Sequence, residues 1–272
     1  MSATTTPGDR SVPPHRRVGA ALAAEWIKLR SLRSVLAVPL LAAVCCLGLA
    51  DLVCANYVSN WSQFDAARQS AFVPFDVNFG FMVVGVLFFG VLGALVVTSE
   101  YGTGLIRSTL AATPQRGLVL AAKAALLTGL ALVTAAAICL TAFLTGQGVL
   151  AGRLPHVGLG DPGVAGRLLG AVFYLTAVAL LGLSVGVLAR STAVAMSALV
   201  GLLLVLPIMV NSLPHDAVWQ HTVPYLPSNL GNALWHSHGD GVPGAGTAAL
   251  LLAAYVVVLG AVAAFSLRRR DA

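Results

Sequence analysis

The chain has 272 residues, of which 10% are charged and 58% hydrophobic, with 16 Lys and Arg against 10 Asp and Glu. A soluble domain is about a quarter charged, so this composition excludes an aqueous globular protein and places many apolar side chains against lipid. The basic excess does not indicate nucleic acid as a partner, because the basic residues sit at the ends of apolar stretches and form no stripe of their own.

The N-terminal region is expected to stay outside the bilayer core. Residues 1–17 are rich in Thr, Pro, Gly, Ser and Arg, a composition typical of a disordered tail, which we place in the cytoplasm. Residues 18–34 predict an amphipathic helix along the inner membrane surface, with Trp26 on its apolar face and Lys28 and Arg30 flanking that face.

Six apolar stretches follow, each close to the ~20 residues that cross ~30 Å of hydrocarbon as a helix. The sequence therefore predicts an all-α integral membrane protein, a six-helix transmembrane bundle that forms a single domain over residues 18–272. The predicted spans are residues 35–55, 79–97, 124–144, 168–189, 193–210 and 247–267.

The fourth and fifth spans are expected to form a tight helical hairpin, or to be joined by a short turn with Arg190 at the lipid headgroups, because only residues 190–192 separate them. Gly182 and Gly186 on the fourth span predict a close contact with another helix. Pro39 and Pro207 are expected to kink the first and fifth spans.

The distribution of Lys and Arg predicts the topology. Thirteen of the sixteen fall in the N-terminal region, the second-to-third loop, the fourth-to-fifth turn or the C-terminus, and only Arg68, Arg153 and Arg167 fall elsewhere. The positive-inside rule then places both termini in the cytoplasm of a protein that spans the cell membrane. An even number of spans agrees with that placement.

Three ionisable side chains lie in apolar surroundings. Glu25 falls within the apolar stripe of the N-terminal helix, where we expect it to pair with Lys28 or reach water; the alternative is a contact with a protein partner. Asp51 lies toward the outer end of the first span and Lys123 near the inner end of the third. A charge within a span is a functional hypothesis by default, but both are expected to reach an interface or water.

The loop between the second and third spans is longer than a simple link requires. Glu100 and Tyr101 end the second span, and residues 104–112 predict a short helix on the cytoplasmic side. Such a helix suits docking against a soluble subunit. The alternative is an interfacial loop in which Arg107 and Arg116 bind phospholipid.

The outer segment, residues 211–246, contains no Lys or Arg, and its middle is too short to cross the membrane. It therefore predicts a re-entrant or interfacial element folded against the bundle. Its four histidines are His215, His221, His236 and His238. No metal site is expected, because no Cys or carboxylate cluster supports the histidines.

The sequence carries no catalytic motif. Gly182-Leu183-Ser184 resembles the Gly-x-Ser of an intramembrane serine protease, but no His falls in any predicted span to act as its base. A Walker A loop is also missing, since neither Lys28 nor Lys123 follows a Gly. We therefore expect no enzyme and no cofactor in this chain, and active transport would need a partner ATPase or an ion gradient.

Four segments, taken in order, resemble the membrane subunits of export-type (type 2) ABC transporters, particularly the six-span permeases of actinobacteria. They are EWIKLRS at 25–31, SEYGTGLIR at 99–107, ARSTA at 189–193 and RRRD at 268–271. The resemblance implies export of a small molecule, drug, lipid or peptide. It also implies a second permease half, identical or paralogous, and a separate cytoplasmic ATPase subunit that binds ATP and Mg.

In that family the second-to-third loop supplies a coupling helix that sits on the ATPase. The resemblance places it here on Glu100, Tyr101, Gly102, Thr103, Gly104, Leu105, Ile106 and Arg107. The N-terminal stretch with Glu25, Trp26, Lys28 and Arg30 matches the family's interfacial helix and is a second candidate docking surface. The family has no fixed substrate motif, so no substrate-binding residue is assigned.

Two other classes fit the same composition. One is an ion-coupled secondary transporter that uses Asp51. The other is a membrane-embedded, lipid-modifying enzyme that uses the outer histidines. A scaffold or sensor subunit without transport would share the fold.

Overall fold

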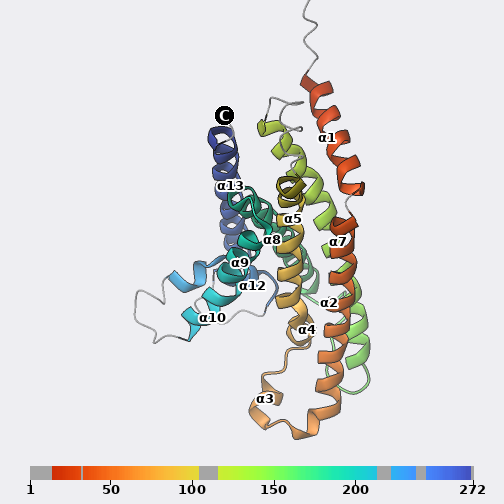
Figure 1. The fold of residues 1–272 in the computed structure, drawn as a ribbon. Coiled ribbons are helices and arrows are strands. Elements are labelled where there is room, and N and C mark those ends of the chain that lie inside the picture. The colour runs from red at the N-terminus through yellow and green to blue at the C-terminus, as the bar shows by residue number, and fades with distance from the viewer. Residues whose placement is uncertain (1–13, 32, 104–115, 213–221, 237–242, 271–272) are drawn as a thin grey trace, which may run out of the picture.

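The computed structural model describes residues 14–31, 33–103, 116–212, 222–236 and 243–270, and every regular element in these ranges is a helix (Figure 1). The elements are α1 (Pro14–Ser31), α2 (Arg33–Asn60), η1 (Trp61–Gln63), α3 (Ala66–Ser70), α4 (Pro74–Asn78), η2 (Phe79–Phe81), α5 (Met82–Thr103), α7 (Arg116–Leu150), α8 (Val164–Ala189), α9 (Thr192–Val200), η3 (Gly201–Val205), α10 (Leu206–Asn211), η4 (Val223–Tyr225), α12 (Pro227–Trp235) and α13 (Ala245–Arg270).

Six helical segments are long and apolar enough to cross a membrane, and each contains one of the predicted spans. They are Val35–Gln63, Pro74–Gly102, Gly117–Leu150, Val164–Ala189, Thr192–Val210 and Ala245–Leu267. The prediction of an all-helical, multi-pass membrane chain is thus confirmed. The third segment has 34 residues and is about 50 Å long at 1.5 Å per residue, so it extends well beyond ~30 Å of hydrocarbon.

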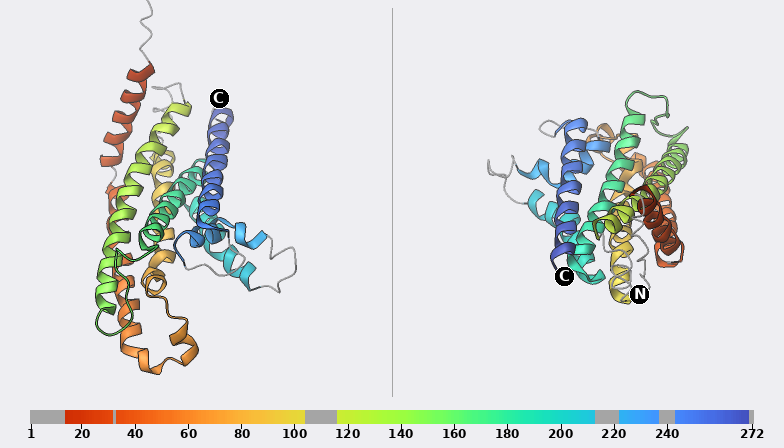
Figure 2. Two further views of the ribbon diagram at one scale, coloured as in Figure 1. Left: turned by 180° about the vertical axis from the view of Figure 1, so that it is seen from behind. Right: turned by 90° about the horizontal axis from the view of Figure 1, so that it is seen from above.

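Helix α8 lies at the centre of the bundle, in contact with α5, α7 and α13, while α2 and α13 lie on opposite flanks (Figure 2). Its contact with α5 is a contact of backbones. A Cβ atom added to Gly93 would overlap the Ala179 carbonyl, and one added to Gly182 would overlap the Gly90 carbonyl. The predicted close contact at Gly182 is therefore present, with α5 as its partner.

The predicted hairpin between the fourth and fifth spans is also present. Arg190 adopts a left-handed conformation with φ of 55°, and its backbone N–H donates to the Gly186 carbonyl to end α8. Ser191 is extended, and α9 begins at Thr192. One left-handed residue and one extended residue are enough to reverse the chain.

The fifth span is irregular where Pro207 was expected to kink it. Residues Gly201–Val205 form a π-helix, η3, between α9 and α10. Pro207 has no N–H to donate to the carbonyl four residues earlier. π-Helical segments commonly occur where the regular helical hydrogen bonds are interrupted in this way.

The outer segment contributes a short buried helix, α12, which packs against α8 and α13. Close approach to α8 depends on two glycines: a Cβ added to Gly170 would overlap the Leu234 carbonyl, and one added to Gly231 would overlap the Tyr174 ring. At nine residues α12 is too short to cross a membrane. Residues 213–221 and 237–242 of this segment lie outside the described ranges.

Candidate functional site

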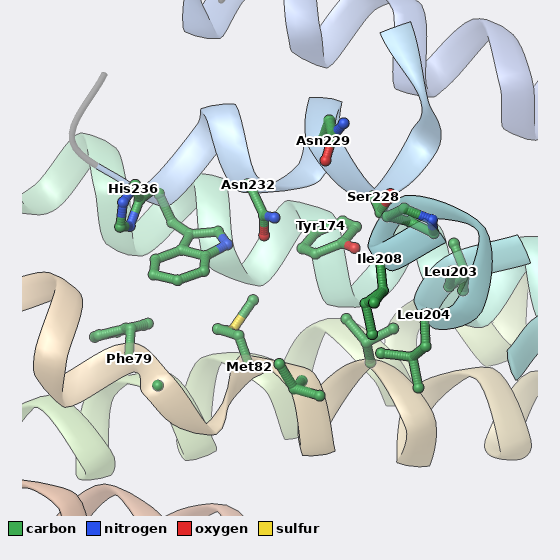
Figure 3. Close-up of a pocket in the computed structure, with 15 residues that line it drawn as sticks. Phe79, Met82, Tyr174, Leu203, Leu204, Ile208, Ser228, Asn229, Asn232 and His236 are labelled. Carbon is green, nitrogen blue, oxygen red and sulfur yellow. The ribbon is translucent and has the colours of Figure 1, made fainter. Parts of the chain in front are cut away.

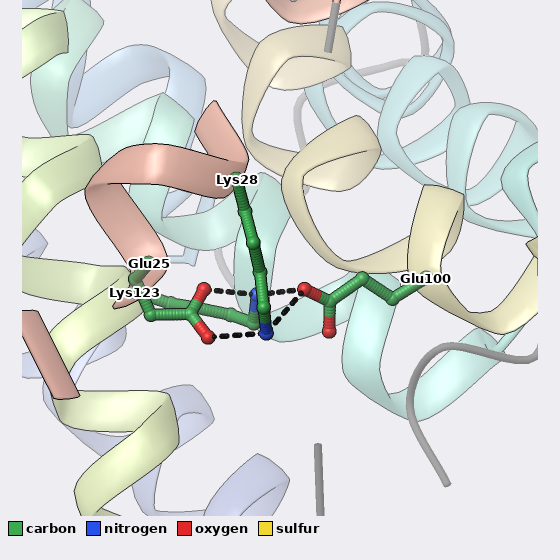
Figure 4. Close-up of polar contacts among 4 residues, drawn as sticks. All are labelled: Glu25, Lys28, Glu100 and Lys123. Carbon is green, nitrogen blue, oxygen red and sulfur yellow. Dashed lines mark hydrogen bonds and ion pairs between the residues drawn. The ribbon is translucent and has the colours of Figure 1, made fainter. Parts of the chain in front are cut away.

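Four charged side chains meet where α1, α5 and α7 come together (Figure 4). The Lys123 Nζ lies 2.5 Å from Glu25 Oε2 and 2.6 Å from Glu100 Oε1. The Lys28 Nζ lies 2.8 Å from Glu25 Oε1 and 3.3 Å from the same Glu100 oxygen. Each ammonium therefore bridges both carboxylates. We refer to Glu25, Lys28, Glu100 and Lys123 as the charge cluster.

The charge cluster is buried, with Lys28 at its edge. The exposed fraction is 3–4% for the side chains of Glu25, Glu100 and Lys123, and 29% for that of Lys28. An isolated charge at such depth would cost several kcal/mol in lost solvation. Two carboxylates and two ammonium groups balance one another, so the cluster as a whole carries no net charge.

Lys28 lies outside the membrane-spanning segments and stays protonated at neutral pH. Burial lowers its pKa, but its hydrogen bond to Glu25 and the negative charge of Glu100 raise it more, so the pKa lies above its usual value of 10.5. The contacts of Lys28 with Glu25 and Glu100 are therefore contacts of a charged ammonium group at neutral pH.

Each member of the cluster is placed by a helix end or a helix face. Glu25 and Lys28 are one turn apart on α1, so their side chains project from the same face. Glu100 lies in the last turn of α5. Lys123 lies seven residues into α7, about 10 Å from its start. The pair Glu100–Lys123 thus joins the two helices that flank residues 104–115.

The end of α5 is also held on its other side, by the turn between α8 and α9. The Arg190 guanidinium carbon lies 5.7 Å from the centre of the Tyr101 ring. The Thr192 hydroxyl donates a hydrogen bond to the buried Thr98 hydroxyl at 2.9 Å. The last turn of α5 is therefore fixed to α1 and α7 by charge, and to α9 by these weaker contacts.

The predicted docking residues divide between described and undescribed parts of the chain. Glu100, Tyr101, Gly102 and Thr103 form the final residues of α5. The other four residues, Gly104, Leu105, Ile106 and Arg107, lie outside the described residues. The Glu100 carboxylate is buried within the charge cluster, so in this structure it contacts the chain's own lysines.

The N-terminal helix packs on the bundle through part of its predicted apolar stripe. Among its described side chains Glu25 and Leu29 are buried, whereas Trp26 and Ile27 are 50% and 69% exposed. α1 packs against the first turns of α7 and runs roughly in line with α2 (Figure 1). Glu25 and Leu29, four residues apart, form the contact because the Glu25 carboxylate reaches Lys123 on α7.

The expected pairing of Glu25 with Lys28 is confirmed, whereas the expectation that Lys123 snorkels or meets water is wrong. Its ammonium is buried between two carboxylates from other helices. A signal for this was present in the sequence. Glu25, Glu100 and Lys123 all lie in apolar surroundings at ends of segments predicted to face the same side, and such charges must find partners.

Asp51 lies in α2, away from the charge cluster, and is half-buried. One of its carboxylate oxygens, Oδ1, is buried and has no hydrogen-bond partner among the described residues. A carboxylate in this state is a candidate for binding a proton or a cation.

Of the four histidines in residues 211–246, only His236 lies within the described residues. His236 is exposed, and its Nδ1 lies 3.4 Å from Asp76, which also lies 3.8 Å from the Arg167 guanidinium. His215, His221 and His238 lie outside the described residues. Within the described ranges, no three His, Cys, Asp or Glu side chains gather as a metal site would require.

No family model matches the chain, and no curated protein matches it significantly.

Proposed function

We propose that the chain is the membrane-spanning subunit of an ATP-driven, export-type ABC transporter. It lines the translocation path with a second permease half, identical or paralogous. A separate cytoplasmic ATPase subunit binds ATP and Mg and docks on the segment 100–107. The chain resides in the cell membrane among lipids, with both termini in the cytoplasm.

The observation that carries the proposal is the ion pair between Glu100 and Lys123, with α1 joined to it through Glu25 and Lys28. A segment that transmits movement from an ATPase must be stiffly attached to the helices it moves. The charge cluster joins the ends of α5 and α7 on either side of residues 104–115. It thereby supports a role for that segment as a lever.

The arrangement of chain ends is compatible with this topology. The C-terminal end of α13 and the ends of α5 and α7 next to residues 104–115 lie at the same end of the molecule as α1, and α3 lies at the opposite end (Figure 1). Of the described basic residues, Lys28 and Arg30 on α1, Lys123 on α7 and Arg269 on α13 belong to the segments at the first of these ends. The positive-inside rule supports a cytoplasmic position for that end.

A substitution at Leu105 tests the lever. The chain is reconstituted in liposomes with the ABC ATPase subunit that co-purifies with it, and ATP hydrolysis and export are measured together. Leu105→Pro, which breaks a helix, should leave ATP hydrolysis and membrane insertion intact while export is lost. Leu105→Ala preserves helix propensity and serves as the matched control. Normal export by the Pro variant would contradict the proposal.

The buried oxygen of Asp51 favours one alternative, an ion-coupled secondary transporter. That protein would transport without any ATPase, driven by membrane potential or an ion gradient, and would stop when Asp51→Asn removes the charge. Export that needs ATP and survives Asp51→Asn would exclude this alternative.

A further inference from the structure

The outer half of the bundle contains a pocket of about 400 Å³ between α5, α8, η3, α10 and α12 (Figure 3). Pockets of this volume commonly bind small organic molecules. The pocket is bordered along η2 and the first turn of α5, from Phe79 to Val86, a rise of about 10 Å. It therefore extends from the outer end of the second span into the membrane-spanning part.

The two sides of the pocket differ in chemistry. Phe79 and Met82 line one side, and Ser228 and Asn232 of α12 face them from the other (Figure 3). Ser228, Asn232 and Trp235 follow one another at intervals of four and three residues, so they form one stripe along α12. A pocket with one apolar wall and one polar stripe matches an amphipathic ligand.

Two of the polar groups on this stripe are buried without a partner. Ser228 Oγ and Trp235 Nε1 have no hydrogen-bond partner among the described residues, although the residues are only 4% and 8% exposed. Buried polar groups are almost always hydrogen-bonded, because leaving one unpaired costs about 1–3 kcal/mol. Both groups can donate to an oxygen atom of a ligand.

The charge of the lining restricts the ligand further. His236 is the one described lining residue that can carry a charge, and it lies at one end of the pocket, where it is exposed and paired with Asp76. Leu203, Leu204 and Ile208 close the other end (Figure 3). An anionic headgroup would be buried there without a cation to neutralise it, which is strongly unfavourable.

The π-helix in the fifth span helps to shape this pocket. Leu203 and Leu204 belong to η3 and line it, and Pro207 follows at the next turn. Segments of π-helix inside membrane helices frequently mark functional sites, because they displace side chains from the regular helical positions.

From these observations we propose that the pocket binds a neutral, single-chain lipid of the glyceride type, taken from the surrounding bilayer. The acyl chain packs against Phe79, Met82 and Val83 of the apolar wall. The uncharged oxygens of the headgroup accept hydrogen bonds from Ser228 Oγ and Trp235 Nε1. This site lies within one chain, and its occupancy does not depend on an ATPase.

Binding can be measured directly through Trp235. In the variant Trp26→Phe/Trp61→Phe/Trp219→Phe, Trp235 is the remaining tryptophan. The protein is placed in phosphatidylcholine nanodiscs and titrated with monostearoylglycerol brominated on its acyl chain, because bromine quenches an indole on contact. We expect saturable quenching that unbrominated monooleoylglycerol reverses. Brominated stearate, ionised at alkaline pH, should bind about ten-fold more weakly or worse.

Two variants and a matched control distinguish binding at a specific site from general contact with lipid. Ser228→Ala should weaken binding about five-fold, the effect of one lost hydrogen bond. Val83→Phe should abolish saturable quenching by filling the pocket, and Val83 is exposed, so the fold tolerates the larger ring. Ser197→Ala, on the exposed face of α9, should bind as the parent does.

Any of three results would overturn the proposal. The quenching does not saturate, stearate binds as tightly as the glyceride, or both Ser228→Ala and Val83→Phe leave the affinity unchanged. Thermal unfolding of each variant confirms that it is folded. No ATPase is present, so failure here leaves the transporter assignment standing, and failure of the Leu105 experiment leaves the lipid site standing.

Discussion

At the residue scale, Lys123 is the side chain on which the charge cluster depends most. It is the only member of the cluster that α7 supplies, and its ammonium touches a carboxylate of α1 and another of α5. If it is removed, two buried carboxylates share Lys28 alone. The remaining net negative charge would then be buried, which is the costly outcome.

Replacing Lys123 with Met keeps the length of the side chain and removes its charge. We expect Lys123→Met to lower the free energy of unfolding by about 3 kcal/mol, as for other broken buried ion pairs. Adding Glu100→Gln should recover part of the loss, since it removes the unpaired negative charge. Thermal unfolding in detergent, compared across the single and double variants, measures both effects.

The matched control is Lys28→Met in the same cluster. Lys28 is 29% exposed, so water screens its contacts and its loss should cost about 1 kcal/mol. Equal destabilisation by the two lysine substitutions, or no recovery in the double variant, would contradict the geometry of the cluster.

At the element scale, the contact between α5 and α8 sets the spacing at the centre of the bundle. Lipid offers no hydrophobic driving force between helices, so their association depends on close packing of small residues. Gly93 and Gly182 allow this approach because each meets a backbone carbonyl of the other helix. The same principle brings α12 against α8 at Gly170 and Gly231.

A single methyl group at Gly93 should force α5 and α8 apart. Gly93→Ala is expected to lower stability by about 2 kcal/mol, within the range for overpacked cores. The comparison is Gly129→Ala on α7, where an added Cβ meets nothing within 4 Å and a gain in helix propensity is expected. Melting temperatures in detergent distinguish the two, and a Gly93→Ala protein as stable as the Gly129→Ala protein would contradict the packing.

At the scale of the whole molecule, the six spans could be predicted because a membrane-spanning helix is defined by the length and polarity of one continuous stretch. The reversal at Arg190 was predictable because a connection of three residues is too short for a further element between the two helices. For Lys123 the sequence indicated that the charge needs a partner but not that the partner is Glu25, because these residues are 98 positions apart and meet only once α1 has packed on α7.

The packing of α1 on the bundle and the pocket beside α12 were not predicted, for related reasons. A helical wheel places Glu25 and Leu29 on the same stripe as Trp26, but it does not show that Glu25 meets Lys123 on another helix. The pocket needs the glycine contacts of α12 with α8, which depend on packing between distant segments. It also needs the π-helix before Pro207, and a proline in a helical stretch predicts an irregularity but not its form.

Docking of a cytoplasmic ATPase on residues 100–107 is the proposal on which the transporter function depends, and site-specific photo-crosslinking gives its sharpest test. A photoreactive amino acid is placed at Leu105, or at Ser62 on the opposite end as control, in the chain expressed together with the ABC ATPase subunit that co-purifies with it. We predict a crosslink to that ATPase from position 105 and none from position 62. No crosslink from position 105 while the two proteins are both present, or a crosslink from position 62, would contradict the account.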